Sequence, residues 1–504
     1  MLDPEVAARR ACRLFEQGIK MKMRMDRSVR VVVLALALAT VGSSLAGCGG
    51  DDSGSGDDGD AAVENGTREG EGGSGEGAQI LVPDDHETIQ MAVDAAEPGD
   101  LILIDEGVYN EAVDVQTDDI TIRGVDRNTV ILDGEFEMEN GIRVLDADGV
   151  VVENMTARNY TVNGFFWTGS DRYRGSYLTA YRNGDYGIYA FDSYDGQFDN
   201  SLGSGSPDAG FYIGECYPCN AVVDNVISEY NGLGYSGTNA GGDLYIINST
   251  FRHNRAGIVP NSGAYELCYP GRESTIVGNV VHDNNNLDAP AISVALLAHG
   301  NGILLGGAIN STVERNLVYT HDRAGIAAVP FPEEDAVDVP PPAEDHDRPC
   351  EETRNDELPD PDEIPDLVLW QATGNIIRDN VVEGSGLADL ASSTIPLDEG
   401  GLTTEDLDNC FSGNTFGSTA PSDLESLAPC EGEGSDGDWE AGAFDLLTLI
   451  ADQPEAPADD AWQTMPEPEP QESMPDARTA PAVRFEGPTL PDLASITVPT
   501  RPGG

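Results

Sequence analysis

A glycine followed by apolar residues returns along the middle of the chain at an almost constant interval. From Gly164 to Gly325, successive marks are spaced by 23, 23, 24, 23, 45 and 23 residues, and 45 is close to two repeats. The marks are Gly164-Phe-Phe-Trp, Gly187-Ile-Tyr-Ala, Gly210-Phe-Tyr-Ile, Gly234-Tyr-Ser-Gly, Gly257-Ile-Val-Pro, Gly302-Ile-Leu-Leu and Gly325-Ile-Ala-Ala. A fixed period of this length is the signature of a solenoid, in which each turn buries its apolar face against its neighbours.

An apolar strand that ends in asparagine forms a second mark, out of phase with the first. Its members lead into Asn154, Asn225, Asn248, Asn279, Asn316 and Asn380. Asparagines at one turn of successive coils can stack as a hydrogen-bonded ladder, and they tolerate left-handed backbone at a corner. Two or three short strands in about 23 residues therefore predict an all-β, single-stranded parallel β-helix. Leucine-rich repeats would need leucines on a fixed template, and propeller blades run to about 40 residues.

The segment before the repeats has the pattern of a cap. Residues 80–82 are extended, residues 87–96 have one apolar helical face, and Leu101-Ile-Leu-Ile is a fully apolar strand. This order resembles the N-terminal cap of pectin-lyase-like β-helix proteins, in which a helix plugs the open end of the coil. The resemblance covers about residues 79–430 and implies a right-handed coil with a capping helix. It does not imply one activity, because this scaffold hosts polysaccharide lyases, hydrolases, epimerases, adhesins and inert spacers.

The N-terminus has the pattern of an export signal. Arg24, Arg27 and Arg30 precede an apolar run at residues 31–41, and Leu45-Ala-Gly-Cys48 follows. These four residues resemble the lipobox of bacterial lipoproteins. The resemblance implies a signal peptide at residues 1–47, with a true start at Met23 or Met25, and lipidation of Cys48. The protein would then be exported and lipid-anchored on the outer face of the membrane. The alternative, a transmembrane helix, needs about 20 apolar residues.

Three stretches lie outside the repeat rhythm. Residues 48–78 consist mostly of Gly, Ser and acidic residues, and they predict a disordered tether that follows the lipidated cysteine. Residues at about 330–365 are rich in Pro, Asp and Glu, and they predict an acidic loop inserted into the β-helix of residues 79–430. Residues 431–504 are rich in Pro, Glu, Asp and Ala, and they predict a disordered acidic tail.

The charge balance excludes several functions. Ninety acidic residues face 27 basic ones, and a net charge of -63 would repel phosphate backbones, so nucleic acid is not an expected partner. The only lysines are Lys20 and Lys22, both in the leader, which excludes Schiff-base and P-loop chemistry in the mature protein. The acidity is typical of a solvated surface, and Ca²⁺ capture is the alternative.

Six cysteines remain besides Cys12 and Cys48, and in an exported protein an even number predicts disulfides. Cys410 and Cys430 bracket a short loop-rich segment and are predicted to pair. Cys216-Tyr-Pro-Cys219 suggests a redox or zinc site as one alternative. Without a βαβ context or a second CxxC, a structural cystine that could also involve Cys268 is favoured.

Two sets of polar residues are candidates for chemistry. Asp192, Glu215 and Asn239 each lie five residues after a repeat glycine, so they would stack in one column that could hold Ca²⁺; solvated turn residues are the alternative. His321-Asp-Arg323 combines an imidazole, a carboxylate and a guanidinium, which could move a proton beside a uronic acid. Catalytic roles are therefore predicted for Asp185, Asp192, His321, Asp322 and Arg323, and an ordinary polar corner is the alternative for the last three.

Aromatic and charged residues gather between residues 165 and 235, and half of the aromatic ones must fill the lumen. The rest would form an outward strip that stacks on sugar rings, and the predicted substrate-binding residues are Trp167, Arg172, Arg174, Tyr189 and Tyr212. One hypothesis is a surface lipoprotein that binds polysaccharide and processes it as a lyase, C5-epimerase or hydrolase. The other is a non-catalytic binding, adhesion or structural module. A groove with two convergent carboxylates would favour the enzyme.

Overall fold

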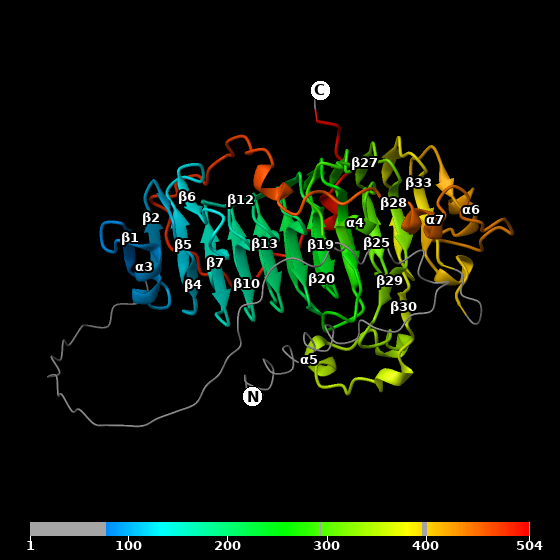
Figure 1. Ribbon diagram of the computed structural model, residues 1–504, viewed down its shortest axis with the longest axis horizontal. Helices are drawn as coiled ribbons and strands as arrows, with labels where there is room; N and C mark the ends of the chain where they lie inside the picture. The colour runs from blue at the N-terminus through cyan, green and yellow to red at the C-terminus, as the bar shows by residue number, and fades with distance from the viewer. Residues whose placement is uncertain (1–76, 293, 396–400, 503–504) are drawn as a thin grey trace. The chain divides into compact units, whose positions relative to one another are not determined.

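A computed structural model describes residues 77–292, 294–395 and 401–502. The proposed signal peptide, Cys48 and nearly all of the tether therefore lie outside the described residues. Within these ranges the chain winds through three parallel sheets, and strands far apart in sequence lie side by side along the coil (Figure 1). The all-β solenoid predicted from the repeats is confirmed.

Each sheet takes one strand from most coils. Sheet A contains β1 (Gln79–Val82), β2 (Leu101–Ile104), β5 (Thr121–Gly124), β8 (Val151–Glu153), β11 (Arg174–Ser176), β14 (Gln197–Asp199), β17 (Ala221–Asp224), β20 (Gly241–Ile247), β23 (Arg272–Val277), β26 (Thr312–Glu314), β31 (Ile376–Arg378) and β34 (Cys410–Ser412). Sheet B contains β3 (Gly107–Tyr109), β6 (Val130–Asp133), β9 (Thr156–Arg158), β12 (Thr179–Tyr181), β15 (Leu202–Ser204), β18 (Ile227–Glu229), β21 (Thr250–Arg252), β24 (Val280–His282), β27 (Leu317–Tyr319) and β32 (Val381–Glu383). Sheet C contains β4 (Val113–Val115), β7 (Asn140–Leu145), β10 (Asn163–Thr168), β13 (Tyr186–Phe191), β16 (Ala209–Gly214), β19 (Leu233–Thr238), β22 (Ala256–Asn261), β25 (Ile303–Gly306), β28 (Ala324–Val329), β33 (Ala388–Ser392) and β35 (Thr419–Ala420).

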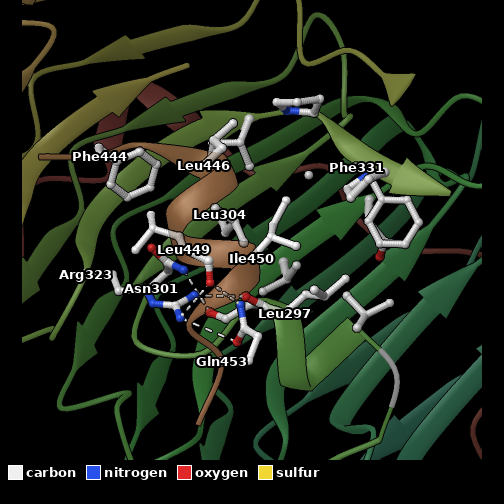
Figure 2. A pocket seen from close by; sticks show the side chains of 18 residues that line it. Leu297, Asn301, Leu304, Arg323, Phe331, Phe444, Leu446, Leu449, Ile450 and Gln453 are labelled. Carbon is white, nitrogen blue, oxygen red and sulfur yellow. Dashed lines mark hydrogen bonds between the residues drawn. The ribbon is translucent and has the colours of Figure 1, made fainter. Parts of the chain in front are cut away.

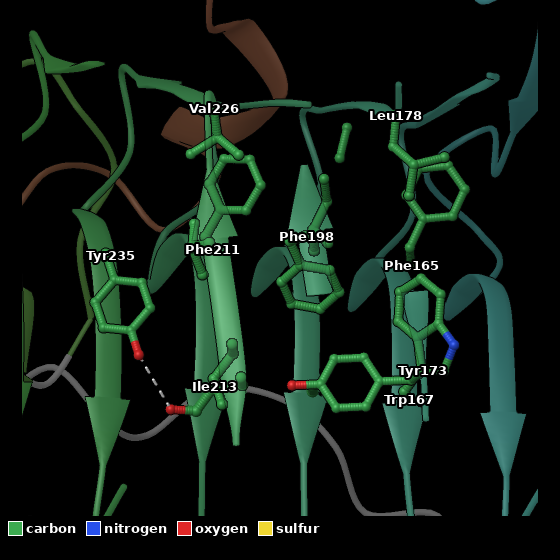
Figure 3. Close-up of a cluster of buried hydrophobic side chains, with 14 of the residues drawn as sticks. Phe165, Trp167, Tyr173, Leu178, Phe198, Phe211, Ile213, Val226 and Tyr235 are labelled. Carbon is green, nitrogen blue, oxygen red and sulfur yellow. Dashed lines mark hydrogen bonds between the residues drawn. The ribbon is translucent and has the colours of Figure 1, made fainter. Parts of the chain in front are cut away.

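The lumen is packed with aromatic side chains in its middle coils. Phe165, Trp167 and Phe211 are fully buried there (Figure 3). Because successive side chains of a strand point to opposite faces, Phe165 and Trp167 of β10 point inward while Phe166 between them points outward. The prediction that Trp167 binds substrate is therefore wrong, since its ring belongs to the core.

Asparagine ladders line the inside of two corners. In one ladder the Nδ2 groups of Asn279, Asn316 and Asn380 each donate to the Oδ1 of the next member, over 3.0 Å in each case, and the ladder ends at Asn414. Asn225 and Asn248 instead face solvent with positive φ angles of 54° and 49°. The sequence mark therefore combined two structural roles, a buried ladder and an exposed left-handed corner.

The cap and the insertion follow the predicted pattern. Helix α3 (Ile89–Ala95) begins at the N-cap Thr88, whose hydroxyl accepts a hydrogen bond from the amide of Met91, and buries Ile89 and Val93 at the open end of the coil. β29 (Phe331–Glu334) and β30 (Leu367–Trp370) form an antiparallel ladder that closes the insertion. This insertion contains η1 (Ala343–Asp345), α5 (Cys350–Thr353) and η2 (Pro361–Glu363). No helix among the described residues is long and apolar enough to cross a membrane.

Three disulfides join the six cysteines of the described residues. Cys410 pairs with Cys430 as predicted, Cys216 with Cys219, and Cys268 with Cys350. The second pair makes the CxxC segment a local cystine without Cys268. The third pair ties the segment that follows β22 to the acidic insertion.

The C-terminal tail differs from the expected disorder, because it runs along the coil toward its N-terminal end and then returns (Figure 1, orange to red). It follows α6 (Leu424–Leu427) and includes α7 (Leu446–Ala451), η4 (Ala461–Thr464) and η5 (Leu493–Ser495). Guanidinium groups of the coil donate to its main-chain carbonyls; these pairs are Arg323 with Leu449, Arg255 with Glu455, Arg182 with Met465, Arg127 with Glu472, Arg123 with Ala480 and Pro481, and Arg315 with Leu493. The tail is thus held on the coil by arginines that bind its backbone, and by the buried side chains of Phe444 and Trp462.

Candidate functional site

An aromatic shelf lies on the outer face of sheet C. The register of β10, β13 and β16 places Phe166, Tyr189 and Tyr212 side by side in adjacent coils. The rings of Phe166 and Tyr189 stack with centroids 4.7 Å apart, and Tyr186 stacks on Tyr189 at 4.3 Å. Tyr212 meets Tyr189 edge-on at 4.9 Å. We call these four rings the aromatic shelf. Phe166, Tyr186 and Tyr189 are half-buried and present ring faces of the kind that sugar rings stack on, whereas Tyr212 is buried against them.

Two aspartates sit at the coil corner where the shelf begins. Asp185 and Asp208 precede register partners Tyr186 and Ala209, so they occupy equivalent positions in adjacent coils, about 4.8 Å apart along the stack. The amide of Asp208 donates to the carbonyl of Asp185 over 3.1 Å. The hydroxyl of Tyr186 donates to a carboxylate oxygen of Asp208 over 2.9 Å. The pair is thus fixed by main-chain register and oriented by the shelf.

The environment of the aspartate pair favours protonation. Burial, with the neighbouring Asp208 as the second cause, raises the pKa of Asp185 to about 8. Burial raises the pKa of Asp208 to about 6, although the hydrogen bond from Tyr186 opposes the change. Two close carboxyls whose pKa values are both raised share a proton near neutral pH, the protonation state from which one can act as an acid and the other as a base.

Two glutamates complete the cluster from outside the aspartate column. Glu266, in the segment between β22 and β23, accepts the hydroxyl hydrogen bond of Tyr212 with oxygen distances of 2.7 and 2.6 Å. Burial raises the pKa of Glu266 well above its ordinary value, and it raises that of Glu215 to about 7. We call the aromatic shelf together with Asp185, Asp208, Glu215 and Glu266 the acid–aromatic site.

The three residues of the predicted calcium column each have other contacts. Asp192 pairs with Arg354 of the insertion, and Glu215 accepts the amide of Leu267 over 3.2 Å. Asn239 is fully buried and donates to the carbonyls of Gly263 and Glu266. Among the described residues no group of three or more His, Cys, Asp or Glu side chains is arranged to hold a metal ion. Asn239 and the Cys268–Cys350 disulfide instead fix the loop that carries Glu266.

The predicted His321-Asp-Arg323 constellation does not converge. His321 points into the coil and ends a second ladder of Asn231, Asn254 and Asn284, with 3.3 Å between its Nε2 and the Nδ2 of Asn284. Burial lowers the pKa of His321 to about 3, so it stays neutral and out of reach of substrate. The carboxylate of Asp322 accepts from Asn285 over 3.1 Å. A catalytic role for these residues finds no support in their placement.

Arg323 lines an apolar pocket between sheet C, α4 (Val294–Leu297) and the tail helix α7 (Figure 2). Its guanidinium donates to the carbonyls of Leu297 and Leu449, which face it from α4 and α7. The cavity measures about 60 Å³, which admits a few water molecules but not a sugar ring. Arg323 therefore holds the tail in place on this part of the sheet.

Arg172 and Arg174 do not join the tyrosines of the predicted binding strip. Arg174 belongs to β11 of sheet A, where it pairs with Asp199 at 2.9 Å. Arg172 pairs with Asp119 at 3.0 Å. Of the five predicted binding residues, only Tyr189 and Tyr212 lie on the shelf, next to the predicted Asp185.

Asp208, Tyr186, Glu266 and Phe166 belong to the site but are absent from the predicted set. The first could have been found, because Asp185 and Asp208 are 23 residues apart and so share a position in the coil. Tyr186 occupies the next position along. Glu266 lies in a segment outside the repeat, and no sequence signal connects it with Tyr212.

The sequence family described as the right-handed beta helix region matches residues 106–267. The fold is a right-handed parallel β-helix. The chain is similar to the A-module of the Azotobacter vinelandii mannuronan C-5 epimerase AlgE4 (TM-score 0.42, 13% identity, 68% of this chain and 92% of that chain). It is also similar to pectate lyase Pel9A (TM-score 0.36, 13% identity, 80% and 90%). A third similar structure is the GH87 α-1,3-glucanase of Streptomyces thermodiastaticus (TM-score 0.39, 14% identity, 69% and 70%). No curated protein matches significantly.

Proposed function

We propose that the protein binds a polysaccharide on the outer face of sheet C and cleaves it by acid–base chemistry at Asp185 and Asp208. The observation that carries the proposal is this carboxyl pair, which occupies equivalent corner positions beside the aromatic shelf. Aromatic shelves orient sugar rings, and a proton-sharing carboxyl pair supplies the groups that glycosidic cleavage requires.

The two close carboxyls titrate as a pair, because Asp208 raises the pKa of Asp185. Near neutral pH the pair would hold one proton. The protonated aspartate would donate to the departing glycosidic oxygen, and the ionised one would attack the anomeric carbon or activate a water for that attack.

The test is an assay of the full chain carrying Cys48→Ser on neutral and acidic polysaccharides, with reducing ends and unsaturated products followed in parallel. We expect new reducing ends without unsaturated products. Asp185→Asn should lower turnover by about 10²–10⁴-fold while polysaccharide binding persists. Asp322→Asn is the matched control, since Asp322 lies outside the acid–aromatic site. Binding without turnover by the unsubstituted chain would instead support the non-catalytic module.

We also propose that the protein is exported and anchored through a lipid on Cys48, on the strength of the sequence before that residue. Labelled fatty acid supplied to cells should enter the protein, and Cys48→Ser should release it into the soluble exported fraction. Retention of the Cys48→Ser protein in the membrane would contradict the proposal.

A further inference from the structure

Positive charge is missing where an acidic polysaccharide would need it. Among the described residues, the carboxyls of Asp208, Glu215 and Glu266 accept hydrogen bonds from Tyr186, the amide of Leu267 and Tyr212 in turn, and none from an arginine. Binding of a sugar carboxylate normally uses an arginine, which donates two parallel hydrogen bonds to it. The acid–aromatic site provides no such group.

Two arginines around the shelf have acidic partners. Arg143, the register neighbour of Phe166, makes two 2.9 Å hydrogen bonds to the carboxylate of Asp114. Arg354 pairs with Asp192, which lies three residues after Tyr189 in the same coil. Both arginines are therefore engaged with carboxylates of this chain.

A uronic acid on the shelf would bring one more carboxylate into this group. Burial, with Asp208 as a further cause, already raises the pKa values of Asp185 and Glu266. A further negative charge would be desolvated beside them without a partner, which is the arrangement by which a site rejects a wrong ligand.

An uncharged sugar unit could use the hydroxyl of Tyr265, which lies next to Glu266 in the chain. The side chain of Tyr265 is half exposed, whereas its hydrogen-bond partners Thr238 and Asn261 are buried. A phenol hydroxyl both donates and accepts hydrogen bonds, as sugar hydroxyls do.

We propose that the acid–aromatic site takes uncharged sugar units and excludes uronic acids, an inference that rests on the proposed function of sheet C as the polysaccharide-binding face. The exclusion is local, arising from Asp185, Asp208 and Glu266, in addition to the repulsion exerted by the whole acidic molecule.

The experiment compares pairs of polymers that share a backbone and differ only in the carboxylate. Polygalacturonate and alginate are converted to neutral polymers by carboxyl reduction, and both forms are titrated against the full Cys48→Ser chain by calorimetry, together with α-glucan, β-glucan, mannan and galactan. The titrations are run at pH 7 in 0.5 M salt, which screens long-range repulsion to within about 5 Å. We expect at least one neutral polymer to bind, and any reduced polymer that binds to do so at least tenfold more tightly than its native form.

Two variants separate local exclusion from net charge. Glu266→Gln and Asp208→Asn should each reduce several-fold the ratio of binding affinities between a reduced polymer and its native form. Asp322→Asn should leave this ratio unchanged. Equal or tighter binding of the native uronates would overturn the inference and leave the proposed function standing. Failure of every polymer to bind would overturn both.

Discussion

One corner of the coil carries acids in some turns and arginines in others, at the same register position. Asp185 and Asp208 come first, Gly232 follows, and Arg255 and Arg323 occupy the position two and four coils beyond Asp208. The arginines donate hydrogen bonds to carbonyls of the tail, whereas Asp185 and Asp208 are half-buried and Asp208 accepts a hydrogen bond from Tyr186. Equivalent positions of the coil therefore form a candidate reaction site in some turns and hold the tail in others.

The difference between the two halves of the corner arises from what packs against them. A side chain at Gly232 would meet Ala295 of α4 at 2.9 Å, so this short helix lies close against the corner between the acids and the arginines. Beyond it, the surface of sheet C is apolar and is covered by α4 and α7 (Figure 2). Before it, the surface consists of tyrosines and carboxyls. Packing of these segments, rather than the repeat, decides which half can meet a ligand.

The largest expected effect concerns the acid half. If Asp185 and Asp208 act together, the turnover rate should be highest between about pH 6 and 8 and fall about tenfold per pH unit on either side. Asp208→Asn should abolish most turnover, and replacing Asp208 with Glu should restore part of it, because a carboxylate is required. Rates measured over pH 4–10 check this. A pH-independent rate, or full activity of Asp208→Asn, would contradict the assignment.

On the arginine half, Arg323→Leu should destabilise the fold without a direct effect on the site. It leaves the carbonyls of Leu297 and Leu449 without their donor, at a cost of about 1–3 kcal/mol for a buried group. Thermal unfolding should show a lower Tm, and hydrogen exchange should show faster exchange in α7. Arg478→Leu, which removes an exposed pair with Asp105, is the matched control and should change stability by less than about 1 kcal/mol. Unchanged exchange in α7 would show that Arg323 does not hold the tail.

The coil itself could be predicted because its period appears directly in the glycine marks, and the cap because its helix has one apolar face. The inward or outward direction of a side chain was harder to assign. Trp167 and His321 were predicted to face solvent, but the alternation along a strand depends on a register that the marks alone do not fix. The tail was misjudged for another reason: its composition contains few apolar residues, whereas its order comes from arginines elsewhere in the chain.

The residues of the acid–aromatic site likewise fall into those that the sequence period connects and those that it does not. Asp185 and Asp208 are linked by the period of 23 residues, so any residue that repeats at this spacing can be paired by sequence. Glu266 reaches Tyr212 only because Asn239 and the Cys268–Cys350 disulfide position its loop. Contacts made by inserted segments carry no periodic signal, and they complete the site.

Inside the coil, burial changes the pKa of a histidine rather than that of a carboxyl group. His321 has its pKa lowered to about 3, so as pH falls below about 6.5 the unfolded chain binds a proton that the folded chain refuses, and stability is lost. His321→Asn should extend the asparagine ladder and remove this term. The variant should gain stability relative to the unsubstituted protein by about 1 kcal/mol per pH unit between pH 6.5 and 4.5. Chemical unfolding at both pH values measures it, and a constant difference would argue against the buried neutral imidazole.

The acids of the outer corner should respond to pH with the opposite sign. The folded pKa of Asp185 is raised to about 8, so its protonated form is stabilised by folding; this contribution is full below about pH 4 and is lost as pH rises toward 8. Asp185→Asn should therefore leave the Tm nearly unchanged at pH 4 and raise it by about 2–4 °C at pH 8.5. Asp322→Asn, outside the site, should show no such trend. A Tm difference for Asp185→Asn that does not grow with pH would mean that the acid half of the corner is as well compensated as the arginine half, and would remove the physical basis for the proton-sharing pair.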